Sequence, residues 1–204
     1  MLTLDHIAIA CEDLEAGSAH VGGVLGAELS GIGAHPHMGT HNRLLSLGRA
    51  EYLEVIAINP GAPGPDQPRW FDLDNFAGAP RITNWICRAP DLTAALAIAP
   101  KGSGSIWDLA RGDFRWRMGI PGDGKLPFDG CFPALIEWQG SAHPAPRLPD
   151  HGIRLTGLSL THPAPEALSA ALAPLISDAR LHVAPGPAPR IGATFSTPAG
   201  AVTL

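Results

Sequence analysis

The stretch Leu4-Asp-His-Ile-Ala-Ile-Ala-Cys-Glu-Asp-Leu14 begins with a short apolar run, reaches two acidic residues and continues into an Ala-rich segment. An apolar run that leads into a helix start returns at residues 82–92, with Asp91, and again at residues 155–163, which lead into Pro165. A short apolar run is typical of a buried strand, and a carboxylate directly after it favours the start of a helix. The sequence therefore predicts the same strand and helix three times, which indicates an internal repeat.

Further candidate strands, separated by turn residues, follow each predicted helix. They lie at residues 27–32, 43–47 and 52–58, at 105–110, 114–118 and 133–139, and at 180–184, 190–196 and 201–204. This order predicts an α+β fold of tandem βαβββ modules that form a curved mixed sheet with helices on its outer face. We expect modules at residues 1–60 and 80–140 and a third βαβββ-like unit at 153–204, packed as one compact protein.

The composition is that of a globular protein, since 45% of the 204 residues are hydrophobic, 16% are charged and the net charge is -5. The Lys and Arg residues are scattered, so we expect no nucleic-acid partner. No apolar run has the roughly 18 residues of a membrane span, and no secretion signal is recognised. Three separated cysteines make no disulfide framework. These features predict a cytoplasmic protein with a small-molecule substrate, and leave a homodimer open.

Three motifs together resemble the glyoxalase-like branch of the vicinal-oxygen-chelate superfamily. They are the start Leu-Asp-His-Ile-Ala-Ile, the loop His35-Pro-His-Met-Gly-Thr-His-Asn-Arg43 and the strand Glu51-Tyr-Leu-Glu-Val-Ile56. The fold of that family is paired βαβββ modules, and the resemblance covers the first 140 residues. Metal ligands in the family come from the first and last strand of each module. The resemblance therefore implies a metal site of His6, Glu54, Glu137 and, in a fourth position, Asn84.

Side-chain alternation along a strand supports part of this set, because it places His6 and Glu54 on the concave side of their strands. Aligning the repeats places Asn84 on His6 and Glu137 on Glu54. A carboxylate inside so apolar a strand needs a partner, and a metal ion is one. The alternative for both carboxylates is a salt bridge to Arg43, Arg115 or Arg117.

The loop at residues 35–43 is interpreted as the rim of a pocket, because binding residues concentrate on loops held by a rigid sheet. The candidates for contact with substrate oxygens are Thr40, His41, Asn42 and Arg43. Its alternative is a solvated turn. Arg115 and Arg117 share one strand face and are candidates to hold an anionic substrate, with a solvent-facing surface as the equal alternative.

One imidazole and two carboxylates suit a single divalent ion such as Zn²⁺, Mn²⁺, Ni²⁺, Co²⁺ or Fe²⁺. Such an ion would grip two substrate oxygens while Glu137 or Glu54 takes a proton from the neighbouring carbon. The leading hypothesis is a metal-dependent lyase or isomerase of glyoxalase type for a small α-oxo or vicinal-oxygen substrate. The main alternative is a metal-free small-molecule-binding protein of the resistance type. Dioxygenase is third, because Asn84 stands where a second histidine is needed. The third unit is assigned no metal role and is expected to close the pocket or cover a sheet edge.

Overall fold

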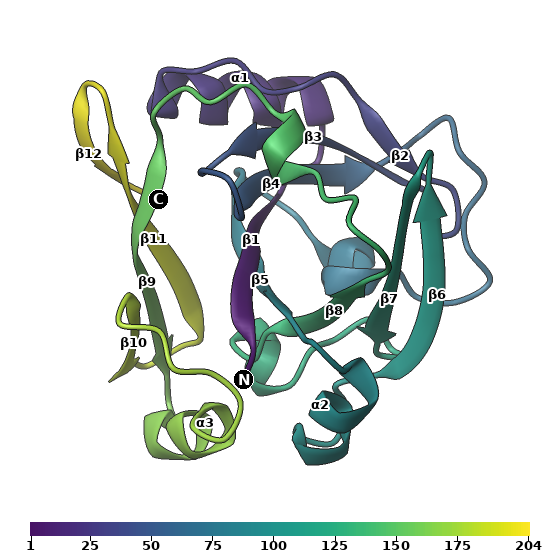
Figure 1. Ribbon diagram of the computed structural model, residues 1–204, viewed down its shortest axis with the longest axis vertical. Coiled ribbons are helices and arrows are strands. Elements are labelled where there is room, and N and C mark those ends of the chain that lie inside the picture. Colours follow the sequence, from purple (N-terminus) through teal and green to yellow (C-terminus); the bar gives the residue numbers. More distant parts are fainter.

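The computed structural model describes all 204 residues as two β-sheets with few helices (Figure 1). The larger sheet has eight strands in the order β2-β3-β4-β1-β5-β8-β7-β6. Its strands are β1 (Thr3–Ala10), β2 (Gly33–His35), β3 (Thr40–Ser46), β4 (Tyr52–Ile58), β5 (Arg81–Arg88), β6 (Ser105–Arg111), β7 (Phe114–Ile120) and β8 (Ala134–Trp138). The smaller sheet has the order β10-β9-β11-β12, with β9 (Arg154–His162), β10 (Leu181–Pro185), β11 (Arg190–Thr197) and β12 (Gly200–Thr203).

The helices begin where the sequence places their caps. They are α1 (Leu14–Leu25), α2 (Leu92–Ile98) and α3 (Pro165–Leu172). The connections between strands also contain three short 3-10 segments, η1 (Trp70–Asn75), η2 (Phe128–Gly130) and η3 (Ala145–Arg147). Asp13 accepts a hydrogen bond from the backbone N–H of Ala16 at 2.7 Å, and Asp91 does the same from Ala94 at 2.9 Å. Each carboxylate thus satisfies a donor that the first helical turn leaves free.

Strand pairing confirms the predicted fold class. In each of the first two modules the first strand pairs in parallel with the last, β1 with β4 and β5 with β8. β1 and β5 pair antiparallel at the centre of the sheet and so join the two modules. The sheet curves until its edge strands nearly meet. This is seen from the contact between Nη1 of Arg111 in β6 and Nε2 of His35 in β2, which are 3.2 Å apart. The third unit repeats the order strand, helix and three strands.

Alternate residues of the central strand pack into two separate cores. Ile7 and Ile9 belong to a cluster of 32 buried residues that also includes residues of all three helices and of the smaller sheet. Ala8 and Ala10 belong to a second cluster of 15 buried residues, on the concave side. Figure 1 shows α1, α2 and the third unit arranged around the outside of the curved sheet. The third unit therefore covers the convex face instead of an edge.

The ladder between β1 and β5 contains two irregularities that matter for the polar residues. Leu4 pairs with Cys87 and His6 with Ile86, so Asp5 is an extra residue in β1. A second register shift lies between Ala8 and Ile9, and there Thr83 is the extra residue in β5. Bulges of this kind redirect side chains that strict alternation would place elsewhere.

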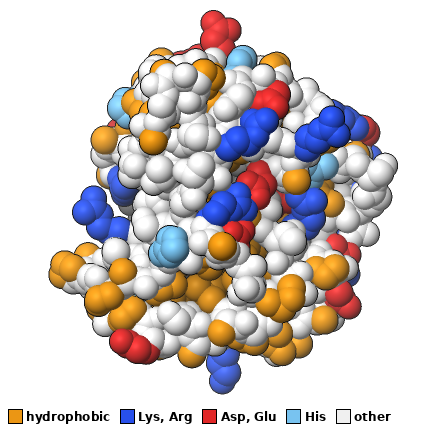
Figure 2. Space-filling view, turned by 60° about the vertical axis from the view of Figure 1, so that its left-hand side comes forward, with side chains coloured by type: hydrophobic (Ala, Val, Ile, Leu, Met, Phe, Trp, Pro, Cys, Tyr) orange, Lys and Arg blue, Asp and Glu red, His pale blue; other side chains and the backbone are white.

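Charged side chains of both signs are mixed on the molecular surface. On the face drawn in Figure 2, Lys and Arg side chains alternate with Asp and Glu and form no continuous basic patch. We find no helix with the length and apolar character that crossing a membrane requires.

Candidate functional site

His6 and Glu54 line one small cavity on the concave side of the larger sheet. They lie on the neighbouring parallel strands β1 and β4, and each is only 5% exposed. Nε2 of His6 is 3.7 Å from Oε2 of Glu54. The structure thus brings together the first-module half of the predicted site.

Asp5 fixes the orientation of the His6 ring. Its Oδ1 lies 2.7 Å from Nδ1 of His6, and its side chain is fully buried. The other carboxylate oxygen accepts hydrogen bonds from Arg88, Trp138 and His143 at 2.8, 3.0 and 3.1 Å. Burial by itself raises the pKa of Asp5, but the hydrogen bonds and charges of His143 and His6 hold that pKa well below its usual value. Asp5 is therefore a permanent carboxylate, and Nδ1 of His6 carries the hydrogen that it accepts.

This arrangement leaves two acceptors facing each other across the cavity. With its hydrogen on Nδ1, neutral His6 presents the lone pair of Nε2, and Oε2 of Glu54 is also an acceptor. The other oxygen of Glu54 accepts a hydrogen bond from Asn42 at 2.5 Å. A separation of 3.7 Å is too long for a direct hydrogen bond. The space between the two atoms is suited to a hydrogen-bond donor or a cation.

A polar wall of His35, Asn42 and Arg111 stands beside Glu54. Nη1 of Arg111 donates to Oδ1 of Asn42 at 3.0 Å and lies 3.2 Å from Nε2 of His35. Because that nitrogen faces donors, the ring hydrogen of His35 is on Nδ1, which lies 3.1 Å from the hydroxyl of Thr40. Burial, and next the charge of Arg111, lower the pKa of His35 to about 3. His35 is therefore neutral, and Arg111 supplies the fixed positive charge of the cavity.

The remaining walls are aromatic and apolar. The ring of Tyr52 stacks on that of His6 with 4.3 Å between centroids and 13° between planes. The apolar lining consists of Trp70, Phe71, Trp116, Met118, Ile136 and Trp138. The enclosed volume is about 30 Å³, which is enough for one or two water molecules.

Glu137 does not reach this cavity. Its carboxylate binds Arg117 at 2.6 Å and accepts from the backbone N–H of Leu92 at 2.7 Å, at the first turn of α2. In β8 the cavity is lined by Ile136 and Trp138, so Glu137 faces the opposite side of the sheet. The repeat alignment that placed Glu137 on Glu54 is displaced by one residue, and such a slip moves a side chain to the other face. The salt bridge to an arginine, the alternative from the sequence, is what the structure shows for Glu137.

Asn84 also lies outside the His6 cavity. It pairs with Ala8, further along β1 than His6, and it lines a different and larger cavity. Because β1 and β5 run antiparallel, residues at matching positions of the two repeats do not lie opposite each other in the sheet. The repeat alignment does not take this into account.

The predicted rim residues separate into two faces, because residues 40–46 form strand β3 and not a loop. Asn42 lines the cavity and Thr40 contacts His35. His41 is absent from the lining, and Arg43 binds Glu15 at 2.7 Å near α1. Arg115 donates to backbone carbonyl groups and Arg117 binds Glu137, so neither lines the cavity. The cation that the cavity contains is Arg111, for which no local sequence motif exists.

The donor set does not fit a resident divalent metal ion. His6 and Glu54 provide two donors, whereas catalytic sites of this kind have three protein ligands. No group of three or more His, Cys, Asp or Glu side chains is arranged so that it could hold a metal ion. The second module contributes Met118, Ile136 and tryptophans where further ligands would stand, and the guanidinium of Arg111 repels a second cation. The four-residue metal site implied by the resemblance is therefore not assembled.

Comparison with known proteins places this geometry in a family. The family model for the glyoxalase-like domain matches residues 4–176. No curated protein matches the sequence. A hypothetical protein from Staphylococcus aureus is similar in structure, with a TM-score of 0.63, 13% identity and coverage of 93% of this chain and 88% of its own. That similarity shows the same fold.

Two epimerase structures are more distant. A methylmalonyl-CoA epimerase variant from Streptomyces coelicolor has 19% identity and a TM-score of 0.47, over 70% of this chain and 100% of its own. The methylmalonyl-CoA epimerase from Mycobacterium tuberculosis has 21% identity and a TM-score of 0.43, over 68% of this chain and 88% of its own.

Proposed function

This chain belongs to the glyoxalase-like domain family, and we propose that it is a metal-independent lyase or isomerase that moves a proton beside a carbonyl group of a small anionic substrate. The observation that carries the proposal is the position of His6 Nε2, whose ring Asp5 orients through Nδ1 and which faces Glu54 across 3.7 Å. A buried histidine oriented by a carboxylate is the usual arrangement of a general base.

His6 is the group that takes the proton from carbon. When Nε2 accepts it, the ring becomes positively charged, and the Asp5 carboxylate stabilises that charge at 2.7 Å. An isomerisation also needs a proton delivered to a neighbouring oxygen or carbon. Glu54 faces the same point of the cavity, and its carboxylate is placed to take the proton of the neighbouring substrate hydroxyl group and return it to the former carbonyl oxygen, while His6 returns its proton to the adjacent carbon.

Arg111 supplies the positive charge that stabilises the substrate during the reaction. Loss of a proton beside a carbonyl group leaves negative charge on the carbonyl oxygen, and a fixed cation in a water-poor cavity stabilises it. Asn42 accepts from Nη1 of Arg111 and donates to Glu54, so it fixes the cation and the carboxylate relative to each other. The substrate class that matches is a small α-oxo or α-hydroxycarbonyl acid.

The size of the cavity restricts the substrate further. A volume of about 30 Å³ accommodates no organic molecule, so we infer that lining side chains move when a substrate enters, and Trp70 and Phe71 of the short η1 segment are the candidates. Closing over the substrate would then exclude water from the reacting carbon.

The metal-dependent form of the activity is the second candidate, and one observation favours it. Nε2 of His6 and Oε2 of Glu54 are separated by 3.7 Å, a spacing that two ligands of one ion also have. A binding protein without turnover would use the same cavity with Arg111 as its anion contact.

Solvent-proton exchange distinguishes these functions. We would incubate the protein in D₂O with pyruvate or hydroxypyruvate and follow the loss of the C–H signal beside the keto group by NMR, after dialysis against EDTA and again after adding Zn²⁺ or Mn²⁺. The proposal predicts exchange after EDTA treatment and a loss of at least about 100-fold in His6→Gln and Glu54→Gln. Exchange only with added ion would establish the metal-dependent form, and saturable binding without exchange would establish the binding protein.

A further inference from the structure

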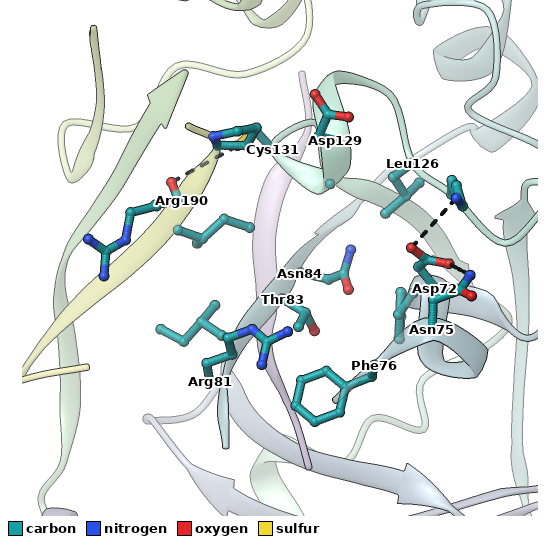
Figure 3. Close-up of a pocket in the computed structure, with 16 residues that line it drawn as sticks. Asp72, Asn75, Phe76, Arg81, Thr83, Asn84, Leu126, Asp129, Cys131 and Arg190 are labelled. Atoms are coloured by element: carbon teal, nitrogen blue, oxygen red, sulfur yellow. Dashed lines mark hydrogen bonds and ion pairs between the residues drawn. The ribbon is translucent and has the colours of Figure 1, made fainter. Parts of the chain in front are cut away.

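A second cavity, of about 340 Å³, lies where β5 begins, between η1, η2 and the start of β11 (Figure 3). The connection between the first two modules, the second module and the third unit all contribute to its lining. Pro189, Arg190 and Ile191 form the wall from the third unit. Its volume falls within the range of small-molecule sites, at the lower end.

Unpaired polar side chains face this cavity. Asn84 is 3% exposed, and its Oδ1 has no hydrogen-bond partner. The hydroxyl oxygen of the neighbouring Thr83 is also buried without a partner. Thr83 is the bulge residue of β5, and Figure 3 shows the amide of Asn84 directed into the open space. An unpaired buried acceptor costs about 1–3 kcal/mol, so this arrangement favours a ligand that donates to it.

The charges around the cavity are unequally compensated. Lys125 lies 4.0 Å from Asp72, and Asp129 lies 3.6 Å from His162, so both carboxylates have a cationic or titratable neighbour. Arg81 lies over the ring of Phe76 at 4.3 Å and donates to the backbone carbonyl of Ala77, without a carboxylate partner. Arg190 also lines the cavity, but Figure 3 shows its guanidinium group directed away from Asn84. The guanidinium group of Arg81 leaves this side of the cavity positive.

We propose that this cavity binds a small hydroxycarboxylate. The hydroxyl group donates to Oδ1 of Asn84, and the carboxylate accepts from the guanidinium of Arg81. An ammonium group in place of the hydroxyl would be repelled by this cation. The site accounts for the unpaired Asn84 amide and gives the third unit a role, because Pro189, Arg190 and Ile191 of that unit form one of its walls.

The site is distinct from the proposed active site. His6, Glu54 and Arg111 do not line it, and Asn84 does not line the His6 cavity. Phe71 lines both cavities and separates them. Binding here is therefore expected whether or not the chain moves protons at His6.

The test uses matched acids with the full chain. We would titrate malate and succinate, which differ by one hydroxyl group, into ¹⁵N-labelled protein and follow the side-chain amide signal of Asn84, identified by its loss in Asn84→Leu. We expect saturable shifts with malate and binding at least tenfold weaker with succinate. Arg81→Gln should weaken malate binding at least tenfold, and Arg190→Gln should weaken it less.

Two control variants keep the outcome interpretable. Arg49→Gln removes an exposed arginine far from the lining and should leave malate binding unchanged. His6→Gln should also leave it unchanged, which separates this site from the proposed activity. The proposal is overturned if malate and succinate give equal shifts, if neither shifts the Asn84 amide, or if Arg81→Gln binds malate as the parent does.

Discussion

Asp5 and His6 are neighbours in one strand, yet Oδ1 of Asp5 lies 2.7 Å from Nδ1 of His6. Neighbouring side chains of a regular strand point to opposite faces and do not meet in this way. The bulge at Asp5 makes the contact, because the ladder passes from the Leu4–Cys87 pair to the His6–Ile86 pair. A fully buried carboxylate is thereby placed behind a histidine whose other nitrogen faces a cavity.

Replacing Asp5 with Asn should destabilise the protein by about 2–4 kcal/mol, because four buried or half-buried donors lose a charged acceptor. The measurement is urea unfolding at pH 7. Since the pKa of Asp5 is depressed in the folded protein, its contribution is fully present above the ordinary value of 3.8 and is lost as the pH falls below it. The difference between parent and variant should therefore shrink below about pH 4. Asp66→Asn, at an exposed carboxylate, is the control and should show no such change.

His35 should make the free energy of unfolding depend on pH above about pH 4 as well. Its pKa is about 3 in the folded protein and 6.5 in the unfolded chain, so the unfolded state binds one more proton between these values. The free energy of unfolding should consequently fall as the pH drops from about 6.5, by up to about 1.4 kcal/mol per unit. In His35→Gln the free energy of unfolding should depend less steeply on pH between pH 6 and 4.5, by the amount that one bound proton contributes. An unchanged slope would show that His35 is not held neutral by burial and Arg111.

Gly33→Ala should disturb the polar wall without unfolding the protein. A Cβ at Gly33 would lie 2.5 Å from Oδ1 of Asn42 and would collide with Nη1 of Arg111. The guanidinium group must then leave Asn42 and His35, and we expect proton exchange to fall about 10–100-fold. Stability should change by less than about 1 kcal/mol, because the displaced atoms end flexible side chains. Gly31→Ala, which meets no atom within 4 Å, is the matched control. Equal exchange in the two variants would remove Arg111 from the proposed mechanism.

Glu137→Gln separates the two carboxylates that the repeat alignment treats as equivalent. The variant loses the ion pair with Arg117 and weakens the contact with Leu92, so the free energy of unfolding should drop by about 1 kcal/mol. Proton exchange should remain at the parent rate, whereas Glu54→Gln should lose it. A parallel loss in both variants would mean that Glu137 acts in the reaction after all.

The sequence predicts the fold well, because its signals are local. The apolar runs, the caps Asp13 and Asp91, and the repeated order of elements suffice for the βαβββ modules. The alternation of β1 and β4 also predicts that His6 and Glu54 share the concave side.

The rest of the site depends on features that no local pattern encodes. The alternation of side chains in β8 is shifted by one residue relative to the repeat alignment, and Glu137 therefore faces α2. Two bulges determine where the side chains of Asp5 and Asn84 point. Arg111 enters the cavity because the sheet curves until β6 approaches β2. Such long-range pairing is set by the whole sheet, so a short repeat alignment cannot recover it.

The tautomer of His6 is the most direct test of the proposed reaction. In a long-range ¹H–¹⁵N correlation spectrum at neutral pH, with His6 identified by its loss in His6→Gln, we expect a protonated Nδ1 and an unprotonated Nε2. Asp5→Asn should disturb this preference, and Asp113→Asn should not. A protonated Nε2 in the parent protein would leave His6 unable to take the proton from carbon and would contradict the proposed reaction.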